Sequence, residues 1–220
     1  MDQKRTKSVK SVDLMKKDFD KEALSWDLNP GRVQLAADIA TAIQKEIRIT
    51  QDMKVMDYGC GTGLLTLSLQ PLVEEITGVD TSQGMLDVLR VKIQKQGISN
   101  IRTLLLSPDS NDLQGAGYQL IVNSMTLHHV VDPERLIREF FTRLSQGGYL
   151  AIADLDCDDG EFHDDSTGVF HNGFDRVHLR TILEQSGFEE VRDITAAEIG
   201  KTVRNAEMRL FSIFLMIARK

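Results

Sequence analysis

Residues 57–63 read DYGCGTG and place three glycines at alternate positions, Gly59, Gly61 and Gly63. The run MKVM precedes them and the run LLTLSL follows, which predicts a strand, a tight turn and a helix. Glycine permits positive φ and close backbone approach, and the first amides of a helix are unsatisfied donors at the positive end of its dipole. We therefore expect a polar ligand that carries a nucleoside to bind at this turn.

The spacing of the glycines separates this turn from two common nucleotide-binding loops. A dinucleotide fingerprint needs glycines at relative positions one, three and six, whereas Leu64 stands sixth here. A phosphate-binding loop needs Gly-x4-Gly-Lys-Ser/Thr, and the GKT at 200–202 has Thr195 where the first glycine belongs. Asp80, at the end of the next apolar run, can accept the hydroxyls of a ribose bound across the turn, or can simply cap the helix that follows.

Short apolar runs alternate with helix-periodic stretches, which is typical of a parallel sheet covered by helices. The expected strands are 53–58, 75–80, 101–106, 118–124, 148–155, 189–194 and 210–219. The expected helices are 31–48, 82–96, a segment that starts at Pro133 and stops before Gly147, and 175–187. No convincing helix separates the last two strands, so we expect them to pair antiparallel as a closing hairpin.

Length and composition indicate an ordinary globular protein. The chain has 220 residues, of which 41% are hydrophobic and 27% charged, and we expect an N-terminal helical cap or arm over 1–30 and one domain over 31–220. No run spans a bilayer and no signal-peptide core is present, so a cytoplasmic protein without membrane contact is expected. Two cysteines are too few for a disulfide framework or a cysteine-rich zinc site, and we expect both to be reduced.

The chain as a whole is acidic whereas its first 17 residues are basic, and both facts indicate which partners to expect. A formal net charge of −7 gives no general attraction to nucleic acid, and none is expected as a partner. The first 17 residues run the other way, since six lysines and arginines stand against two aspartates. This basic arm is either a contact for an anionic partner or a solvated end, and the second interpretation is preferred. Nothing in the sequence predicts the oligomeric state.

Several stretches together resemble the class I S-adenosylmethionine-dependent methyltransferases of the small UbiE-like kind. They are VMDYGCGTG at 55–63, ITGVDTSQGML at 76–86, the segment 118–156 and the closing hairpin, and the resemblance covers nearly all of the chain from about Trp26. It implies an α/β, Rossmann-like sandwich: a mostly parallel seven-stranded sheet with an antiparallel C-terminal strand and helices on both faces. It also implies S-adenosylmethionine as cofactor and S-adenosylhomocysteine as product.

The resemblance assigns cofactor contacts to the glycine turn and to the ends of the second and fourth strands. The expected contacts are Asp57 and the amides around Gly59, Cys60, Gly61 and Gly63 for the methionine end, Asp80 for the ribose, Thr81 and Met85 for the adenine, and Asn123, Ser124 and Met125 for the methionine amine, with His128 following on the cofactor side. The amide of Cys60 is expected to face the cofactor. Trp26 stands where related proteins have an aromatic lid, although an anchor between cap and core explains it equally well.

The third strand departs from the family pattern. It usually ends with an acid that accepts a hydrogen bond from the adenine amino group, but Ser107 stands there, followed by Pro108 and Asp109. Either the side chain of Asp109 or a backbone carbonyl takes over this contact, or adenine binding is weaker than usual.

Transfer of a sulfonium methyl needs alignment and exclusion of water, and a general base only when the acceptor is protonated. His128 and His129 follow the fourth strand, and because adjacent residues usually point apart we expect at most one to face the site, with His129 the structural one. His163 and His171 border a glycine-containing stretch that could close over the site. His128, His163 and His171 are therefore the candidate bases, although packing or capping explains such histidines as often.

An acid-rich stretch, DLDCDDGEFHDD, follows the fifth strand. Asp154, Asp156 and Asp158 alternate and are expected to share one face while the strand lasts. The pattern imitates a calcium loop, but Gly160 comes one residue late, so an EF-hand is rejected. A solvated substrate loop is preferred to a magnesium site, and no resident metal is expected.

The sequence excludes some classes of methyl acceptor but does not identify the acceptor itself. The fourth strand ends with NSMT at 123–126 and lacks the Asn/Asp-Pro-Pro-Tyr/Phe signature of nucleic-acid amine methyltransferases. We therefore expect methyl transfer to a small molecule whose nucleophile is oxygen, nitrogen, carbon or sulfur. The alternatives are an NAD(P)-dependent oxidoreductase, which the glycine spacing disfavours, and a non-catalytic S-adenosylmethionine-binding protein.

Overall fold

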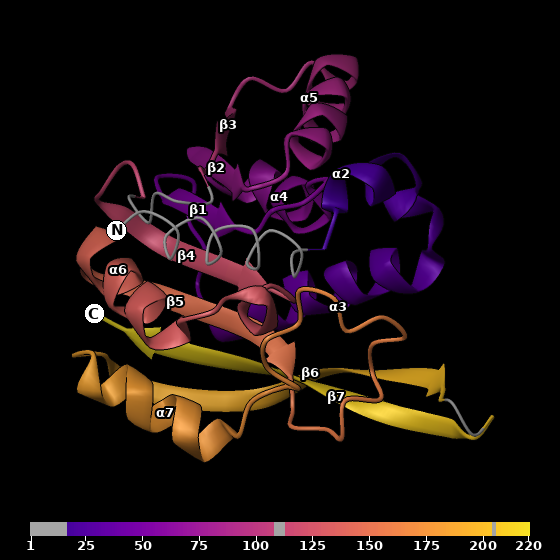
Figure 1. The fold of residues 1–220 in the computed structure, drawn as a ribbon. Coiled ribbons are helices and arrows are strands. Elements are labelled where there is room, and N and C mark those ends of the chain that lie inside the picture. The colour runs from indigo at the N-terminus through magenta and orange to yellow at the C-terminus, as the bar shows by residue number, and fades with distance from the viewer. Residues whose placement is uncertain (1–16, 108–112, 204–205) are drawn as a thin grey trace, which may run out of the picture.

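The computed structural model describes residues 17–107, 113–203 and 206–220, and within them a single seven-stranded sheet has the order β3-β2-β1-β4-β5-β7-β6 (Figure 1). The strands are β1 (Lys54–Tyr58), β2 (Glu75–Asp80), β3 (Ile101–Leu105), β4 (Tyr118–Ser124), β5 (Leu144–Leu155), β6 (Glu189–Thr202) and β7 (Met208–Arg219). The helices are α2 (Phe19–Glu22), η1 (Ala23–Leu28), α3 (Pro30–Glu46), α4 (Leu64–Leu69), η2 (Gln70–Leu72), α5 (Gln83–Gln96), η3 (Leu127–His129), α6 (Pro133–Arg143) and α7 (Arg176–Gln185).

The pairing of the strands confirms the expected fold class. β3, β2, β1, β4 and β5 run parallel to one another, whereas β7 runs antiparallel to both β5 and β6. Each expected strand is present close to its expected position. Because the carboxyl ends of the parallel strands lie at one edge of the sheet, the glycine turn, Asp80 and the end of β4 come together there.

Two boundaries differ from the expected ones. α6 ends at Arg143 and β5 already begins at Leu144, where it pairs with Tyr118 ahead of a register shift. β6 continues to Thr202, well past the expected end at 194, because its second half pairs with the first half of β7 as a two-stranded arm. β5 reaches β7 only as far as Ile213, so the arm extends beyond the rest of the sheet.

The sheet is buried on both faces, as a parallel sheet requires. Strand β7 shows this directly: Ile213 and Leu215 pack with α3 and α4 in one hydrophobic cluster, whereas Phe214 and Met216 pack with α6 and α7 in the other. α3 contributes Ile39 and Ile43, whose spacing matches the amphipathic pattern read from the sequence. Caps set the helix starts, since the side chains of Asp132, Asp175 and Ser82 accept from backbone amides of α6, α7 and α5.

The N-terminal part of the described chain, α2 and η1, folds over the carboxyl edge of the sheet and contacts α5 and α3. We call residues 17–28 the lid segment. Among the described helices, none is both long enough and apolar enough to cross a membrane. Apart from Lys17, the residues of the basic arm lie outside the described ranges, and so does Asp109.

Candidate functional site

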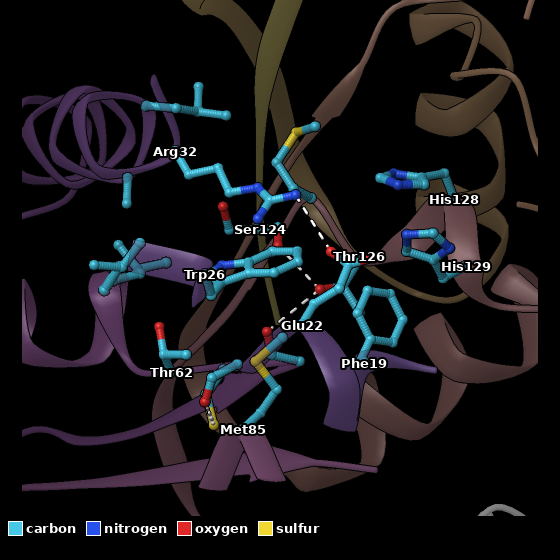
Figure 2. A pocket seen from close by; sticks show the side chains of 18 of the residues that line it. Phe19, Glu22, Trp26, Arg32, Thr62, Met85, Ser124, Thr126, His128 and His129 are labelled. Carbon is cyan, nitrogen blue, oxygen red and sulfur yellow. Dashed lines mark hydrogen bonds and ion pairs between the residues drawn. The ribbon is translucent and has the colours of Figure 1, made fainter. Parts of the chain in front are cut away.

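A cavity of about 670 Å³ opens at the carboxyl edge of the sheet, beneath the lid segment (Figure 2). Its walls come from the glycine turn, the ends of β2 and β4, the loop after β5 and the arm of β6. Most of the expected site residues line it: Trp26, Asp57, Gly59, Cys60, Gly61, Asp80, Thr81, Met85, Ser124, Met125, His128 and His163. The structure therefore brings together segments from both halves of the chain.

Four expected site residues lie outside the cavity. Gly63 packs against Leu89, and Ser107 is exposed at the end of β3 without lining the cavity. Asn123 is buried and donates from Nδ2 to the Tyr58 carbonyl at 3.0 Å, so its side chain braces β1 against β4. His171 donates from Nε2 to the Val130 carbonyl at 2.9 Å and stacks on a phenylalanine. This geometry removes His171 as a candidate base.

The space left by the missing side chains of the turn's glycines is filled mainly by other side chains of the protein. A Cβ atom at Gly59 would lie 2.3 Å from Oγ1 of Thr126, and one at Gly63 would lie 2.3 Å from Cδ1 of Leu89. Only Gly61 borders open space, since the nearest side-chain atom to its Cβ would be Sδ of Met85 at 4.0 Å. All three have positive φ. The close approach expected for a ligand is therefore confined to Gly61.

The amides of the turn correct one expectation. The N–H groups of Gly59 and Cys60 both donate to the Val79 carbonyl, at 2.7 and 3.0 Å, and that of Gly61 donates to Oδ2 of Asp80 at 2.7 Å. The Cys60 amide therefore faces β2 and not a cofactor. Its thiol packs in an apolar cluster with Leu86 and Leu89, and burial raises the thiol pKa well above its usual value.

Two carboxylates sit under the turn. Asp80 accepts from the amides of Gly61 and Ser82, and burial raises its pKa. It is not the cap of α5, a role that Ser82 takes. Asp57 is buried and accepts from Oγ1 of Thr66 at 2.5 Å, and burial, with the nearby charge of Asp80 adding to it, raises the pKa of Asp57 to about 7. Each carboxylate has lone pairs beyond those used in these bonds, and both residues line the cavity.

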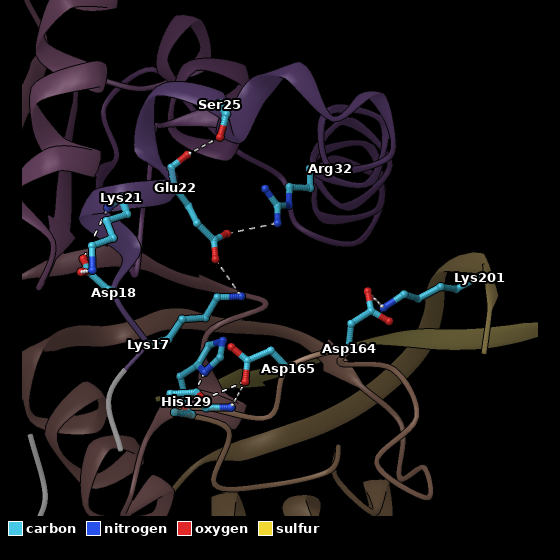
Figure 3. Close-up of polar contacts among 12 residues, drawn as sticks. Lys17, Asp18, Lys21, Glu22, Ser25, Arg32, His129, Asp164, Asp165 and Lys201 are labelled. Carbon is cyan, nitrogen blue, oxygen red and sulfur yellow. Dashed lines mark hydrogen bonds and ion pairs between the residues drawn. The ribbon is translucent and has the colours of Figure 1, made fainter. Parts of the chain in front are cut away.

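Glu22 of the lid segment and Arg32 of α3 line the cavity and were not singled out from the sequence. Trp26 lines the cavity with the Arg32 guanidinium stacked 3.7 Å from the centre of its ring. Glu22 lies between two cations, 3.1 Å from Nζ of Lys17 and 3.4 Å from Nη2 of Arg32 (Figure 3). Arg32 follows the Asn-Pro-Gly at the start of α3. Its closeness in sequence to Trp26, the expected lid residue, is the feature from which a role for Arg32 could have been predicted.

A cluster of three histidines lines the cavity, two of them on η3 after β4 and the third in the loop after β5. The ring centroids of His128 and His129 are 4.2 Å apart, and that of His163 is 4.9 Å from His128. Burial is the main reason that the pKa values of His129 and His163 are lowered to about 4. The expectation that His129 would turn away is wrong, because η3 is a 3-10 turn and both of its histidines reach the cavity.

The alternating acids Asp154, inside β5, and Asp156 and Asp158, after it, have separate partners. Asp154 is fully buried, and its Oδ1 lies 2.6 Å from Nδ1 of His128. Asp156 forms a two-pronged ion pair with Arg176, and Asp158 accepts from the amide of Gly160. The sequence predicted a solvated loop for this stretch, and for Asp154 that prediction is wrong because the residue is buried in β5. Among the described residues, no group of three or more histidine, cysteine or acidic side chains is arranged to hold a metal ion.

Comparisons with known proteins agree with this picture. Residues 32–192 match a family model described as a methyltransferase domain. An uncharacterised methyltransferase of Schizosaccharomyces pombe is 30% identical over 170 residues, which cover 70% of this chain and 60% of that protein. A ubiquinone biosynthesis O-methyltransferase of Colwellia psychrerythraea is 31% identical over 133 residues, covering 58% and 53%. The chain thus spans between half and 60% of the length of these curated relatives.

Solved structures show the same fold at lower identity. Phosphoethanolamine N-methyltransferase 2 of Haemonchus contortus, determined in complex with S-adenosyl-L-methionine, superposes with a TM-score of 0.66 at 14% identity. The superposition covers 82% of this chain and 52% of the nematode protein.

Proposed function

The chain belongs to the methyltransferase domain family, as its motifs indicated, and on that premise we propose that it transfers a methyl group from S-adenosylmethionine to a small molecule. The observation that carries this proposal is the cavity in which Asp57, Gly61, Asp80 and Trp26 meet at the carboxyl edge of the sheet. Ligands of open α/β sheets bind at that edge. The structural neighbour that binds S-adenosylmethionine supports the same assignment of cofactor.

The residues present fit this cofactor. Asp80 lies at the tip of β2 with lone pairs left for two ribose hydroxyls, and Thr81 and Met85 line the adjoining wall, which suits an adenine. Asp57 offers a carboxylate to the methionine amine. We assign the methionine carboxylate to Arg32, because it is a cation of the cavity wall and stacks on Trp26. The adenine amino group is left to a backbone carbonyl or to Asp109, since Ser107 does not line the cavity.

S-adenosylmethionine, when bound, supplies a methyl group activated by its sulfonium sulfur. The protein aligns the acceptor with this methyl group and excludes water beneath the lid segment. His128 is the residue we assign as general base for a protonated acceptor. Its Nδ1 donates to Asp154, which keeps the Nε2 lone pair free and stabilises the imidazolium after proton uptake.

His163 and the two alternative functions have less support. His163 is a poor base in this scheme, because its lowered pKa of about 4 disfavours proton uptake near neutral pH. An oxidoreductase reading has no support in the glycine spacing, whereas a non-catalytic binding protein is the alternative that experiment must separate. A cytoplasmic location, a small-molecule partner and the partition into an arm over 1–30 and a domain over 31–220 complete the proposal.

Calorimetric titration tests the cofactor assignment. S-adenosylhomocysteine is expected to bind, NADH is not, and Asp80→Ala is expected to weaken binding about tenfold or more because the ribose loses its carboxylate. Asp87→Ala removes an exposed acid on the helix that follows Asp80 and serves as the matched control. Binding of NADH alone, or equal affinities for the two variants, would contradict the proposal.

Methyl transfer separates a catalyst from a binding protein. Incubation with methyl-labelled cofactor and a metabolite extract is expected to label a small molecule, and His128→Ala is expected to lower that labelling about 100-fold or more without changing affinity for S-adenosylhomocysteine. Cofactor binding without any labelled product would favour the non-catalytic alternative.

A further inference from the structure

Three charged side chains of the cavity wall are joined by ion pairs into one chain. Glu22 lies in the middle: its Oε1 is 3.1 Å from Nζ of Lys17 and its Oε2 is 3.4 Å from Nη2 of Arg32. All three residues line the cavity, and Figure 3 shows Glu22 between the two cations. We call these three residues the charged triad. The proposed function uses only Arg32, so Glu22 and Lys17 need an account of their own.

The contact between Glu22 and Arg32 is the longer of the two ion pairs. It joins one nitrogen to one oxygen, and within the described chain the guanidinium of Arg32 donates no other hydrogen bond. A guanidinium binds a carboxylate best through two parallel hydrogen bonds. The side chains of Glu22 and Arg32 are 32% and 35% exposed, and ion pairs open to water contribute little net free energy. Arg32 can therefore exchange Glu22 for another carboxylate at small cost.

The cofactor carries such a carboxylate. We assigned the methionine carboxylate of S-adenosylmethionine to Arg32, whose guanidinium lies 3.7 Å from the centre of the Trp26 ring. In the structure Arg32 is already paired with Glu22. A second carboxylate that approaches the same guanidinium meets a like charge, which destabilises both. The arriving carboxylate and Glu22 therefore compete for Arg32.

Lys17 gives Glu22 a partner after the exchange. It contacts the other carboxylate oxygen, so Glu22 can release Arg32 and keep its ion pair with Lys17. The triad holds two positive charges and one negative charge, so one carboxylate from the cofactor brings the formal sum to zero. Every charge of the triad then has a partner, both with and without the cofactor.

The other acids on the far side of the cavity have partners outside the triad. Asp164 pairs with Lys201 at 3.0 Å, and Asp165 accepts from the amide and the hydroxyl of Thr167 at 2.9 and 2.7 Å. Within the described chain, neither acid forms an ion pair with a member of the triad. Both line the cavity and add negative charge to it. This charge disfavours any carboxylate ligand, but it is the same in every variant compared in the test.

We propose that Glu22 is a positioning residue for the cofactor: it holds Arg32 while the site is empty and yields it to the methionine carboxylate, whereupon Lys17 alone retains Glu22. This inference rests on the proposed function and concerns the methionine end of the same site. S-adenosylhomocysteine has the same carboxylate as S-adenosylmethionine. The exchange therefore lowers the affinity for cofactor and product alike, and its reversal helps the product to leave.

Two substitutions in the triad should have opposite effects, which separates the exchange from a structural role. Calorimetry with S-adenosylhomocysteine measures both. Glu22→Gln is expected to bind about two- to fivefold more tightly, because the competing charge is gone while the side chain keeps its size. Lys17→Gln is expected to bind more weakly by about the same factor, because Glu22 then has no other cation and competes harder for Arg32. If the triad only held the lid segment in place, both substitutions would weaken binding.

A ligand without the carboxylate and a control variant complete the test. Decarboxylated S-adenosylhomocysteine keeps the adenosine, the sulfur and the amine, and its affinity is not expected to rise in Glu22→Gln. Asp18→Asn removes a negative charge from the same lid segment, where Asp18 pairs with the exposed Lys21 at 2.7 Å. This control is expected to leave both affinities unchanged.

Three results would overturn the proposal. They are unchanged or weaker binding of S-adenosylhomocysteine in Glu22→Gln, tighter binding in Lys17→Gln, and an equal gain for both ligands in Glu22→Gln. A wild-type protein that does not bind S-adenosylhomocysteine would instead contradict the function on which the inference rests. If Arg32→Ala bound S-adenosylhomocysteine as tightly as the wild type, the methyltransferase proposal would stand and the exchange at Arg32 would be refuted.

Discussion

At the scale of single residues, each glycine of the turn makes room for a different neighbouring group. Gly59 and Gly63 leave room for Thr126 and Leu89, whereas Gly61 alone leaves room at the cavity. The alternate spacing therefore reflects the packing of Thr126, the N-cap of η3, and of α5 against the turn as much as it reflects a ligand. Positive φ at the three positions reinforces the need for glycine.

Substitution of Gly59 tests this packing argument. Gly59→Ala is expected to lower the free energy of unfolding by about 3 kcal/mol or more, because positive φ costs about 1–2 kcal/mol for alanine and the clash with Thr126 adds to it. Gly97→Ala is the control, since Gly97 also has positive φ but its Cβ would meet no atom within 4 Å. Urea unfolding measures both variants. Equal losses would show that backbone conformation alone accounts for the glycine.

At the scale of elements, two aspartates hold the lid segment on the domain. Asp20 accepts from Oγ of Ser82 at 2.5 Å and from the amide of Gly84 at 2.7 Å, at the start of α5. Asp27 accepts from Oγ1 of Thr62 at 2.6 Å and pairs with Lys92 at 2.5 Å. The lid segment is thereby attached both to the glycine turn and to the helix that follows β2. Closure over the cavity depends on these contacts and not on the short helices themselves.

Removal of one contact should loosen the lid segment selectively. Asp20→Ala is expected to increase amide hydrogen exchange across residues 17–28. It is also expected to weaken binding of S-adenosylhomocysteine several-fold, because part of the binding free energy is then used to order the lid segment. Exchange in β1 and β4 is expected to stay unchanged. Asp38→Ala is the control, because Asp38 is a half-buried acid on α3 whose hydrogen bond goes to Gln34 of the same helix. Unchanged exchange in the lid segment would show that aromatic packing alone holds it.

At the scale of the whole molecule, the first described residues and the C-terminal hairpin both border the cavity. Lys17 and Phe19 line it from the N-terminal side, and Ile199 and Lys201 line it from the arm of β6. Lys201 also pairs with Asp164 at 3.0 Å, which ties the arm to the loop that carries His163. The site is completed only when the distant parts of the chain have packed. Its buried ionisable groups consequently influence the stability of the entire fold.

The pH dependence of stability should contain two opposing contributions. The pKa of Asp57 is raised from 3.8 to about 7, so the native state binds an extra proton and stability falls as pH rises through this window. The pKa values of His129 and His163 are lowered from 6.5 to about 4, so the unfolded state binds more protons and stability rises with pH between those values.

Two variants separate the contributions. In urea unfolding between about pH 4 and pH 8, Asp57→Asn is expected to gain stability with pH more steeply than the wild type, because the opposing carboxylate is gone. His163→Gln is expected to gain less stability than the wild type as the pH rises over the same range. A curve for Asp57→Asn that runs parallel to the wild-type curve would contradict the burial of an ionisable carboxyl at this position.

The sequence by itself determined the order of strands and helices, the parallel sheet with its closing hairpin, and the position of the glycine turn and Asp80. These follow from local causes: periodicity of apolar residues, caps such as Asp132, and glycine where φ is positive. The parallel arrangement then places every strand end at one edge, so the location of the site was also predictable. The length of β6 was not, because its second half forms only by pairing with β7.

Only the tertiary structure decided which side chains meet at that edge. Asp154 reaches His128 from the neighbouring strand, Arg32 stacks on Trp26, and His129 enters the cavity through a 3-10 turn. The carboxyl ends of the parallel strands were expected at one edge of the sheet, but the direction of each side chain there depends on where the strand stops and how the chain turns next. That direction is set by packing between residues far apart in the sequence, and no local periodicity encodes it.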